Sequence, residues 1–198
     1  MNEPVYILIR TSRRPKFFKT LWQSIQEQTY PNIVTITHSD NTRDKYVKGD
    51  IIVRGRPEPQ KGRGFYNLYN NTLLANIPKI SGWYVFIDDD DMYASPDAIE
   101  RFVKSSRQDY INVARANRGN GKIWPKTWKG QKVFQTECFM LHTKYRKMAK
   151  WWAKQGGDHY YTKQITKKLP INWIDNLIVC NAQAGKGRGL RLDKGQKK

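Results

Sequence analysis

The sequence predicts an α/β fold in a single domain: a mixed, mostly parallel sheet with helices on both faces. Its 198 residues fit one domain of ordinary size with a continuous core. Apolar runs typical of buried strands alternate with segments of helical spacing. Four consecutive aspartates follow the most apolar run, and ligands on such sheets bind beyond the carboxyl ends of the strands.

The first half of the chain alternates strands and helices. Residues 5–9 are continuously apolar, as in a strand buried on both faces, and Pro15 marks the start of a helix that ends near Gln28. A strand at 33–37 then completes a parallel, right-handed crossover. The further elements expected in this half are a short strand at 51–53, a helix at 65–76 and the central strand at 83–87.

The second half is expected to hold helices, strands and one long loop. They are a helix from Pro96 to about Ser106, a strand at 110–115, a loop at 117–132, a strand at 134–141 and a helix at 144–155. The tail at 185–198 is rich in Gly, Lys and Arg, so we expect it to be flexible without a ligand.

The charge balance points to an anionic partner. Lys and Arg total 36 against 17 Asp and Glu, a formal net charge of +19. Such an excess produces a positive field that attracts polyanions. Nucleic acid, an anionic membrane surface and a phosphorylated small substrate all remain open on this ground.

The two cysteines, Cys138 and Cys180, are too few and too far apart for a disulfide framework or a zinc ribbon. A reducing, cytoplasmic setting is therefore expected. The first residues lead into a strand rather than a signal peptide, and no apolar stretch approaches the length of a membrane span. These features are typical of a soluble intracellular protein.

The acidic run from Asp88 to Asp91 is the strongest chemical signal. Four like charges at the end of a buried strand cost stability unless a cation compensates them. Mg²⁺ and Mn²⁺ prefer carboxylate oxygens and commonly bridge to the phosphates of a nucleotide, so the run favours a nucleotide-using enzyme. The alternative is an acidic turn that caps the helix beginning near Pro96.

Several short motifs occur in a fixed order in the first half. They are residues 9–15, residues 28–32 at the end of the first helix, residues 39–42 after the second strand, and residues 85–91. In this order they resemble the GT-A fold glycosyltransferases of family 2, which transfer a sugar from a nucleotide-sugar donor. The resemblance implies a GT-A (Rossmann-like) domain at 1–184, with a nucleotide-sugar half at 1–110 and an acceptor half at 111–184.

The resemblance also implies which residues meet the nucleotide. Thr11 and Arg13 lie where the first loop touches the base, and Asp40 matches the carboxylate that hydrogen-bonds a uracil edge. The family's usual pair of aspartates is Ser39-Asp40 in this chain, which leaves the base preference open. A UDP-sugar is the first expectation.

The acidic run matches the family's metal motif. Asp90 is the expected ligand of Mn²⁺ or Mg²⁺, and Asp88 or Asp89 is expected to meet the ribose or the metal's water shell, with Asp88 as a second candidate ligand. A metal beside both phosphates stabilises the negative charge that develops on the leaving diphosphate. Lys61 and Arg63, in a glycine-punctuated loop, are candidates to assist, and a solvated loop is an equal alternative for them.

A second carboxylate is needed as a base for the acceptor hydroxyl. Residues 156–158, Gly-Gly-Asp, resemble the family's Gly-Glu/Asp-Asp segment, which lies at a helix start and supplies that base. Asp158 is therefore the candidate catalytic base, in an inverting displacement, and simple helix capping is its alternative role. Between Gly121 and Lys168 the only acids are Glu137 and Asp158.

Lysines and tryptophans gather in the second half, a pattern that suits phosphate contact and stacking on exposed bases. The leading hypothesis is transfer to a hydroxyl on a modified, hydroxymethylated base of DNA, flipped from the duplex. The three histidines lack zinc-binding spacing and are expected to be structural or surface residues, and His159, beside the proposed base, joins the acceptor side. The acceptor-binding candidates are Trp124, Lys126, Trp128, Lys129 and His159.

Two other functions stay open. A basic helix at 144–155 with Trp151 and Trp152 could lie on an anionic membrane and serve a lipid-linked or cell-envelope acceptor, or could simply pack one Trp with its lysines in water. A protein of another class, binding nucleic acid on a degenerate transferase scaffold without turnover, is also compatible with the charge. The joint presence of Asp40, Asp90 and Asp158 argues against it.

Overall fold

The computed structural model describes residues 2–56, 64–118, 122–125 and 134–182. The strands are β1 (Val5–Thr11), β2 (Ile33–Ser39), β3 (Ile51–Arg54), β4 (Trp83–Asp88), β5 (Asp91–Tyr93), β6 (Ile111–Arg118), β7 (Lys122–Trp124), β8 (Phe139–His142) and β9 (Ile171–Ala182). The α-helices are α1 (Pro15–Gln26), α2 (Leu68–Ala75), α3 (Ala98–Ser105) and α4 (Gly157–Thr166). Short 3₁₀ turns are η1 (Phe65–Asn67), η2 (Thr136–Cys138) and η3 (Thr143–Tyr145).

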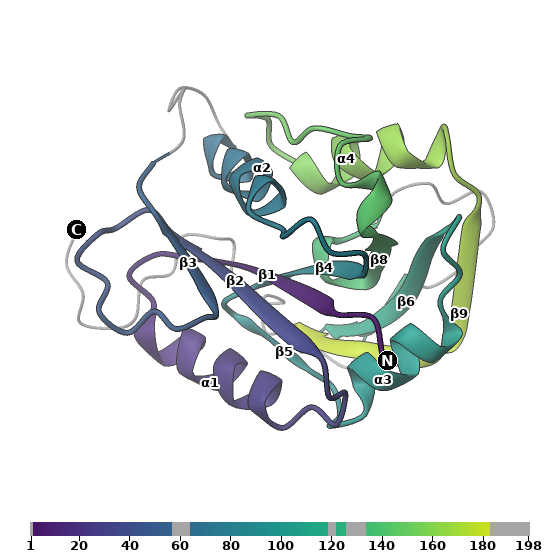
Figure 1. Ribbon diagram of the computed structural model, residues 1–198, viewed down its shortest axis with the longest axis horizontal. Coiled ribbons are helices and arrows are strands. Elements are labelled where there is room, and N and C mark those ends of the chain that lie inside the picture. Colours follow the sequence, from purple (N-terminus) through teal and green to yellow (C-terminus); the bar gives the residue numbers. More distant parts are fainter. Residues whose placement is uncertain (1, 57–63, 119–121, 126–133, 183–198) are drawn as a thin grey trace.

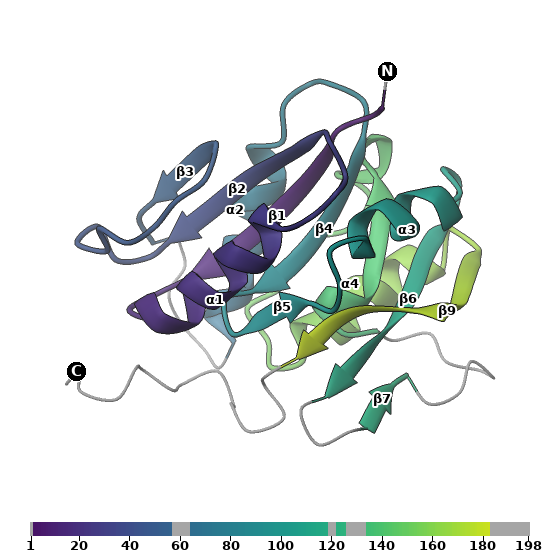
Figure 2. The same cartoon turned by 90° about the horizontal axis from the view of Figure 1, so that it is seen from below.

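The strands of the described residues form one mixed sheet. Their order is β3-β2-β1-β4-β8-β6-β9-β5, with β7 paired to β6. Helices α1 and α3 lie on one face of the sheet, and α2 and α4 lie on the other (Figure 1). The view from below shows α1 and α3 together in front of the strands (Figure 2). The predicted single-domain α/β class is confirmed.

The first half of the sheet is parallel, because strand and helix alternate as predicted. β1 pairs in parallel with β2 and with β4, and β2 pairs in parallel with β3. The apolar run of β1, Val5–Ile9, is at most 1% exposed, as its continuous hydrophobicity requires. The carboxyl ends of β1, β2 and β4 therefore meet at one edge, where Arg10 stands opposite Asp88.

The second half is mainly antiparallel and is built by long-range pairing. β8 lies antiparallel between β4 and β6, whereas the long strand β9 runs parallel to β6 and antiparallel to β5. The acidic run spans the turn between β4 and β5, so Asp88 ends one strand and Asp91 begins the next. This turn brings both halves of the sheet to the same edge.

An aromatic core joins α4 to the central strands. Trp151 stacks on Tyr161 of α4 at 4.5 Å between ring centroids, and both rings lie against Phe86 of β4. Phe139 of β8 stacks on the same tyrosine. Aromatic pairs of this kind add to the hydrophobic stabilisation of a core. Trp151 is therefore a structural residue, 2% exposed.

The predicted helix at 144–155 is wrong: beyond the short turn η3, this segment has no helix. Side chains of α2 and α4 satisfy its backbone instead. Asn71 accepts from the Trp151 N–H (2.9 Å) and donates to the Trp151 carbonyl (2.8 Å). Gln164 accepts from the Lys150 N–H (3.2 Å) and donates to the Lys150 carbonyl (2.9 Å). These amides replace helical hydrogen bonds, so the periodic lysines did not indicate a helix.

Other boundaries differ in smaller ways. The predicted strand at 134–141 begins only at Phe139, after the turn η2. The strand β7 lies within the predicted loop at 117–132. Among the described helices, none has the length and apolar character needed to cross a membrane.

Candidate active site

Carboxylates from both halves of the chain converge beyond the ends of β1 and β4. Asp88 ends β4, and Asp158 lies in the first turn of α4. Burial raises the pKa of Asp158, and the negative charge of Asp88 raises it further. The two groups are thus electrostatic neighbours although 70 positions separate them in the sequence. The structure brings together the predicted metal motif and the predicted base.

Two guanidinium groups compensate the acidic run. Arg10 donates to Asp88 Oδ1 at 2.8 Å, and its guanidinium also lies over the ring of Tyr66 at 4.9 Å. Arg14 binds two carboxylates at once, Asp89 at 2.6 Å and Asp90 at 2.7 Å. The chain itself therefore supplies cations for three of the four aspartates, so the charge of the run alone is a weaker argument for a metal than the sequence suggested.

Asp89 is held from inside the protein. The Thr11 hydroxyl donates to its Oδ2 at 2.7 Å, and both side chains are buried. Burial raises the pKa of Asp89 to about 7, although Arg14 and Thr11 both favour its ionised form. With its hydroxyl engaged by Asp89 and the Tyr46 phenol (2.9 Å), Thr11 supports the acidic run in this structure.

Asp91 is a buried acid of the run without an ion pair in the described residues. It is 4% exposed, and its Oδ1 has no hydrogen-bond partner. Burial, followed by the charge of Glu137, raises its pKa well above the ordinary value. A neutral carboxyl group at this position avoids an uncompensated buried charge. We therefore count Asp91 as a core residue and not as a candidate metal ligand.

Sequence reasoning gave no role to Glu137, which lies in the turn η2. Burial raises its pKa to about 7, its own backbone N–H opposes that rise, and the charges of Asp88 and Asp158 add to it. Glu137 therefore belongs to the same acidic cluster. The signal that could have found it was its position as the only acid besides Asp158 in a long basic stretch.

The start of α4 is fixed by a close contact with η1. Asn67 is 5% exposed and donates from Nδ2 to the Lys154 carbonyl at 2.7 Å. A Cβ at Gly157 would lie 2.4 Å from the Asn67 amide, so any larger residue would have to displace that buried, hydrogen-bonded side chain. The backbone N–H of His159 donates to Asp158 Oδ1 at 2.8 Å, which orients the proposed base.

Of the residues predicted to contact the nucleotide base, Asp40 follows β2 and Arg13 follows β1. Tyr69 of α2 donates to Asp40 Oδ2 at 3.1 Å, while Asp40 Oδ1 is buried without a partner. The neighbouring His38 packs on Tyr69, and burial lowers its pKa to about 4, so it is a neutral structural residue. Arg13 has φ of 52° and donates its backbone N–H to Asp44 at 2.9 Å.

A second carboxylate, Asp44, lies in the loop that follows Asp40. It is buried, accepts from the Ser39 hydroxyl at 3.0 Å and is bonded by the Asn41 amide at 2.8 Å. The carboxylate that shapes this loop thus comes from four residues further along the chain. Ser39 serves as its partner.

Within the described residues, the candidate donors for a metal are carboxylates of the acidic run. No group of three or more Asp, Glu, His or Cys side chains within the described ranges is arranged to hold an ion. Asp88, with a side chain 33% exposed, and Asp90, two positions further along the same turn, each offer a carboxylate. Mg²⁺-type sites commonly use one or two carboxylates and complete their shell with substrate phosphates and water, so these residues fit a metal that arrives with a nucleotide.

The predicted acceptor residues are only partly placed. His159 is exposed beside Asp158, and Trp124 lies on β7 with the guanidinium of Arg118 over its ring at 4.7 Å. The remaining predicted residues, namely Lys61, Arg63, Lys126, Trp128, Lys129 and the tail, lie outside the described residues.

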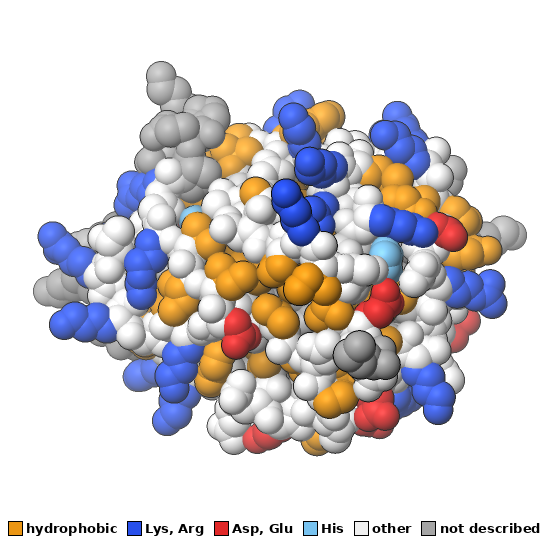
Figure 3. Space-filling model, in the orientation of Figure 1, with side chains coloured by type: hydrophobic (Ala, Val, Ile, Leu, Met, Phe, Trp, Pro, Cys, Tyr) orange, Lys and Arg blue, Asp and Glu red, His pale blue; other side chains and the backbone are white. Residues whose placement is uncertain are grey.

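An aromatic surface lies at the start of α4, where Trp152, noted above for the membrane alternative, meets Tyr160. Trp152 is 43% exposed, its ring centroid lies 5.7 Å from that of Tyr160, and Lys154 Nζ lies over both rings at 5.3 and 5.4 Å. Lys and Arg side chains also gather along the upper edge and both ends of the face in Figure 3. The region therefore combines stacking surface with positive charge.

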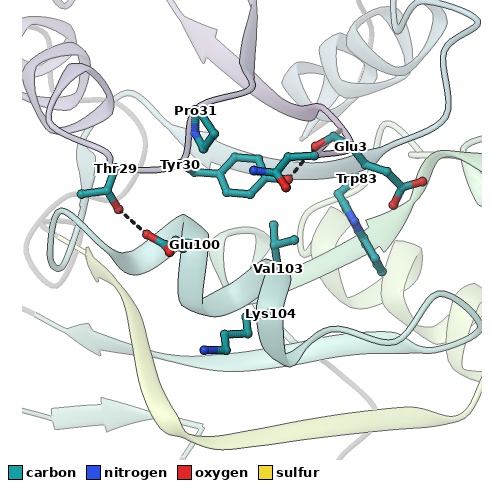
Figure 4. Close-up of a pocket in the computed structure, with 9 residues that line it drawn as sticks. Glu3, Thr29, Tyr30, Pro31, Trp83, Glu100, Val103 and Lys104 are labelled. Atoms are coloured by element: carbon teal, nitrogen blue, oxygen red, sulfur yellow. Dashed lines mark hydrogen bonds between the residues drawn. The ribbon is translucent and has the colours of Figure 1, made fainter.

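A cavity of about 370 Å³ opens on another part of the molecule (Figure 4). Its walls include Glu3, Tyr30 and Trp83, at the amino-terminal ends of the parallel strands. Tyr30 donates to the Glu3 carbonyl (2.6 Å), and Thr29 donates to Glu100 (2.7 Å). These polar groups are paired with one another, and the cavity lies at the opposite end of β4 from Asp88.

Solved structures share this fold. The chain is similar to TarS 1–349 of S. aureus in complex with UDP-GlcNAc, with a TM-score of 0.70 and 13% identity over 98% of this chain and 62% of that chain. It is also similar to the mannosyltransferase PcManGT from Pyrobaculum calidifontis in complex with GDP-Man and Mn²⁺, with a TM-score of 0.63 and 11% identity over 90% of this chain and 56% of that chain.

Identities this low show a common fold alone. The chain spans about three fifths of the length of these two proteins and 36% of a longer TarS structure, to which it is 14% identical with a TM-score of 0.69. No protein-family model and no curated protein matches the sequence.

Proposed function

We propose that the protein is a metal-dependent, inverting glycosyltransferase that moves a hexose or pentose from a nucleotide-sugar to a hydroxyl on a polyanionic acceptor. The observation that carries the proposal is the meeting of Asp158 with Asp88 at one sheet edge. The fold adds support, because two of its solved examples hold UDP-GlcNAc or GDP-Man. A UDP-sugar is the first donor to test.

The donor lies, in this proposal, across the carboxyl ends of β1, β2 and β4, in the half at 1–110. Asp40 receives the base, and Asp88 faces the ribose and the metal's water shell, while Asp89, buried against Thr11 and Arg14, supports the run from inside. Asp90 and Asp88 hold Mn²⁺ or Mg²⁺, which when bound stabilises negative charge on the leaving diphosphate. Thr11 and Arg14 keep the run in place through their bonds to Asp89.

Asp158 acts as the base, from the acceptor half at 111–184. It takes the proton of the acceptor hydroxyl as that oxygen bonds to the anomeric carbon, and the bond from this carbon to the diphosphate oxygen breaks. Its raised pKa makes it a stronger base than an exposed aspartate. Attack opposite the leaving group inverts the anomeric configuration.

DNA with hydroxymethylated bases is the first acceptor to test. The formal charge of +19 favours a polyanion, and Trp152 with Lys154 offers stacking and cationic contacts beside Asp158. The membrane alternative has lost the helix on which it rested, because 144–155 is not helical and Trp151 is buried. Both cysteines are free and buried, as expected for the proposed cytoplasmic setting.

The proposal is tested by incubating the protein with Mn²⁺, a panel of nucleotide-sugars and DNA containing hydroxymethylated pyrimidines. Mass spectrometry of the digested nucleosides should show one added sugar, lost in Asp158→Ala. Donor hydrolysis without transfer to DNA would keep the transferase and exclude this acceptor, and a second panel of envelope glycans and lipid-linked sugars would follow. Salt-dependent DNA binding with neither hydrolysis nor transfer would identify a non-catalytic scaffold.

A further inference from the structure

We infer that Arg14 makes metal binding at Asp90 conditional on the donor diphosphate, an inference that rests on the proposed function. Arg14 would hold Asp89 and Asp90 in position and would also supply positive charge to them. It fills the electrostatic place of the metal while the donor is absent, and it disfavours a bare divalent ion. The metal then binds well only together with a nucleoside diphosphate.

The geometry of the guanidinium supports this role. One terminal nitrogen of Arg14 donates to Asp89 Oδ1 at 2.6 Å, and the other lies 2.7 Å from Asp90 Oδ2. A single cation thus spans two consecutive carboxylates with the paired donors of its fork, which a lysine cannot do. It occupies one oxygen of the residue that would ligate the metal.

Arg14 is held firmly in this position. Its side chain is 12% exposed, and its guanidinium lies 4.8 Å from the centre of the Phe17 ring on the first turn of α1. Pro15 begins that helix immediately after it. Asp89 is fixed in turn by the Thr11 hydroxyl. Because Asp89 and Asp90 are buried and Arg14 is only slightly exposed, water screens their charges poorly.

Charge then decides which ligands are tolerated together. A divalent ion at Asp90 would lie close to the guanidinium, and two cations at short range repel strongly in a buried site. A diphosphate adds several negative charges and supplies oxygen ligands to the metal. It therefore offsets the repulsion, and by linkage the metal strengthens nucleotide binding by the same factor.

The test is a Mn²⁺ titration followed by electron paramagnetic resonance, with and without saturating UDP, and then GDP. In the wild-type chain UDP or GDP should tighten Mn²⁺ binding by about 10- to 100-fold, the usual range of coupling between two ligands. Arg14→Gln should bind bare Mn²⁺ about tenfold more tightly and lose most of that coupling. Arg14→Met, which keeps an apolar stem against Phe17, is the second charge-removing variant.

Two controls separate charge from shape. Arg14→Lys keeps the positive charge but not the fork that spans both carboxylates, so it should retain part of the coupling. Arg101→Gln removes one positive charge from exposed α3, where the side chain donates to the Asn176 carbonyl, and should match the wild type. Circular dichroism and the Tm of each variant establish that it is folded before titration.

The outcomes distinguish the two levels of the argument. Coupling in the wild type that persists unchanged in Arg14→Gln and Arg14→Met would overturn the role of Arg14 and leave the proposed function intact. Wild-type protein that binds no Mn²⁺ with either nucleotide would overturn the metal-dependent donor site and the inference with it. Coupling that disappears in both charge-removing variants and survives in Arg14→Lys would establish the inference.

Discussion

The two halves of the chain handle their acidic residues differently. In the first half, Asp88, Asp89 and Asp90 each meet a guanidinium from the β1 strand or the loop that follows it. In the second half, Asp158 and Glu137 have no ion pair of this kind in the described structure. Burial raises the pKa of each, and the charges of neighbouring carboxylates raise it further. Burial raises the pKa of Asp89 as well, so the difference lies in the partners: a guanidinium lies beside each of Asp88, Asp89 and Asp90, whereas Asp158 and Glu137 are buried without such an ion pair in the described residues.

The difference suits the two tasks proposed for the halves. A donor with a diphosphate needs a fixed arrangement of charges, which ion pairs and the Thr11 bond to Asp89 provide. A general base needs a pKa nearer the working pH, which burial provides for Asp158. Mutations in the two halves should therefore fail in different ways.

The largest effect is expected for Asp158→Asn. Loss of the base should lower kcat for transfer by about 10²- to 10⁴-fold, because an amide cannot accept the proton. The Kd for UDP with Mn²⁺, measured by calorimetry, should stay within about twofold of the wild type, because the donor half is intact. The charge-matched control is Asp175→Asn, at an exposed ion pair with Arg115. Weakened UDP binding in Asp158→Asn with unchanged kcat would contradict the division of tasks.

Asp90→Asn should show the opposite pattern. Transfer should fall by about 10²- to 10³-fold, and EDTA should have the same effect on the wild type, because charge on the leaving diphosphate is no longer stabilised. Here Mn²⁺ binding in the presence of UDP, followed by electron paramagnetic resonance, should also be lost. Asp97→Asn, on an exposed surface beside Arg101, is the control. Full Mn²⁺ binding by Asp90→Asn would show that Asp90 is not a ligand of the metal.

Gly157→Ala probes the contact between the halves. Its Cβ would lie 2.4 Å from the Asn67 amide, so it should lower the free energy of unfolding by about 1–3 kcal/mol through overpacking. Urea denaturation measures the loss. In an Asn67→Ala background the same substitution should cost clearly less, because the crowded group is gone. Equal costs in both backgrounds would show that the contact does not limit position 157.

The smallest effect concerns Glu137 and pH. Its folded pKa of about 7 exceeds its ordinary value of 4.5, so the folded state holds a proton that the unfolded state has lost between these limits. Stability from this group is full below about pH 4.5 and declines as pH rises through 7. Glu137→Gln should therefore raise Tm at pH 8 by about 2–4 °C, as about 1 kcal/mol does at this length, and should flatten the pH profile. Scans are made with EDTA, and an unchanged slope from pH 5 to 8 would refute the prediction.

Local sequence predicted the first half better than the second. The strands near Ile7, Ile36 and Val85 are recognisable from apolar runs in the sequence. Their parallel pairing follows from the helices that connect successive strands. The long strand β9 gave no comparable signal, because polar and exposed residues interrupt its apolar positions. The helix predicted at 144–155 failed for a different reason, since Asn71 and Gln164 bind its backbone from other helices.

The candidate site was predictable in its acids but not in its cations. The position of Asp88 to Asp91 after a strand, and of Asp158 after two glycines, indicated acidic chemistry directly. Arg10 could have been paired with Asp88 from the register of two parallel strands that end together. The bridge from Arg14 to Asp89 and Asp90 depends on the backbone path of the loop before α1. That path cannot be predicted from residue spacing in the sequence.

The segment before α4 owes its course to three amide side chains, on Asn67, Asn71 and Gln164. Its conformation is therefore encoded at positions far from it in the chain. A designer who transplanted residues 150–157 into another scaffold would have to carry these amides with it. Conversely, the segment could change its own side chains freely at exposed positions such as Trp152 and Lys154, so substrate contacts could diversify there while the backbone kept its path.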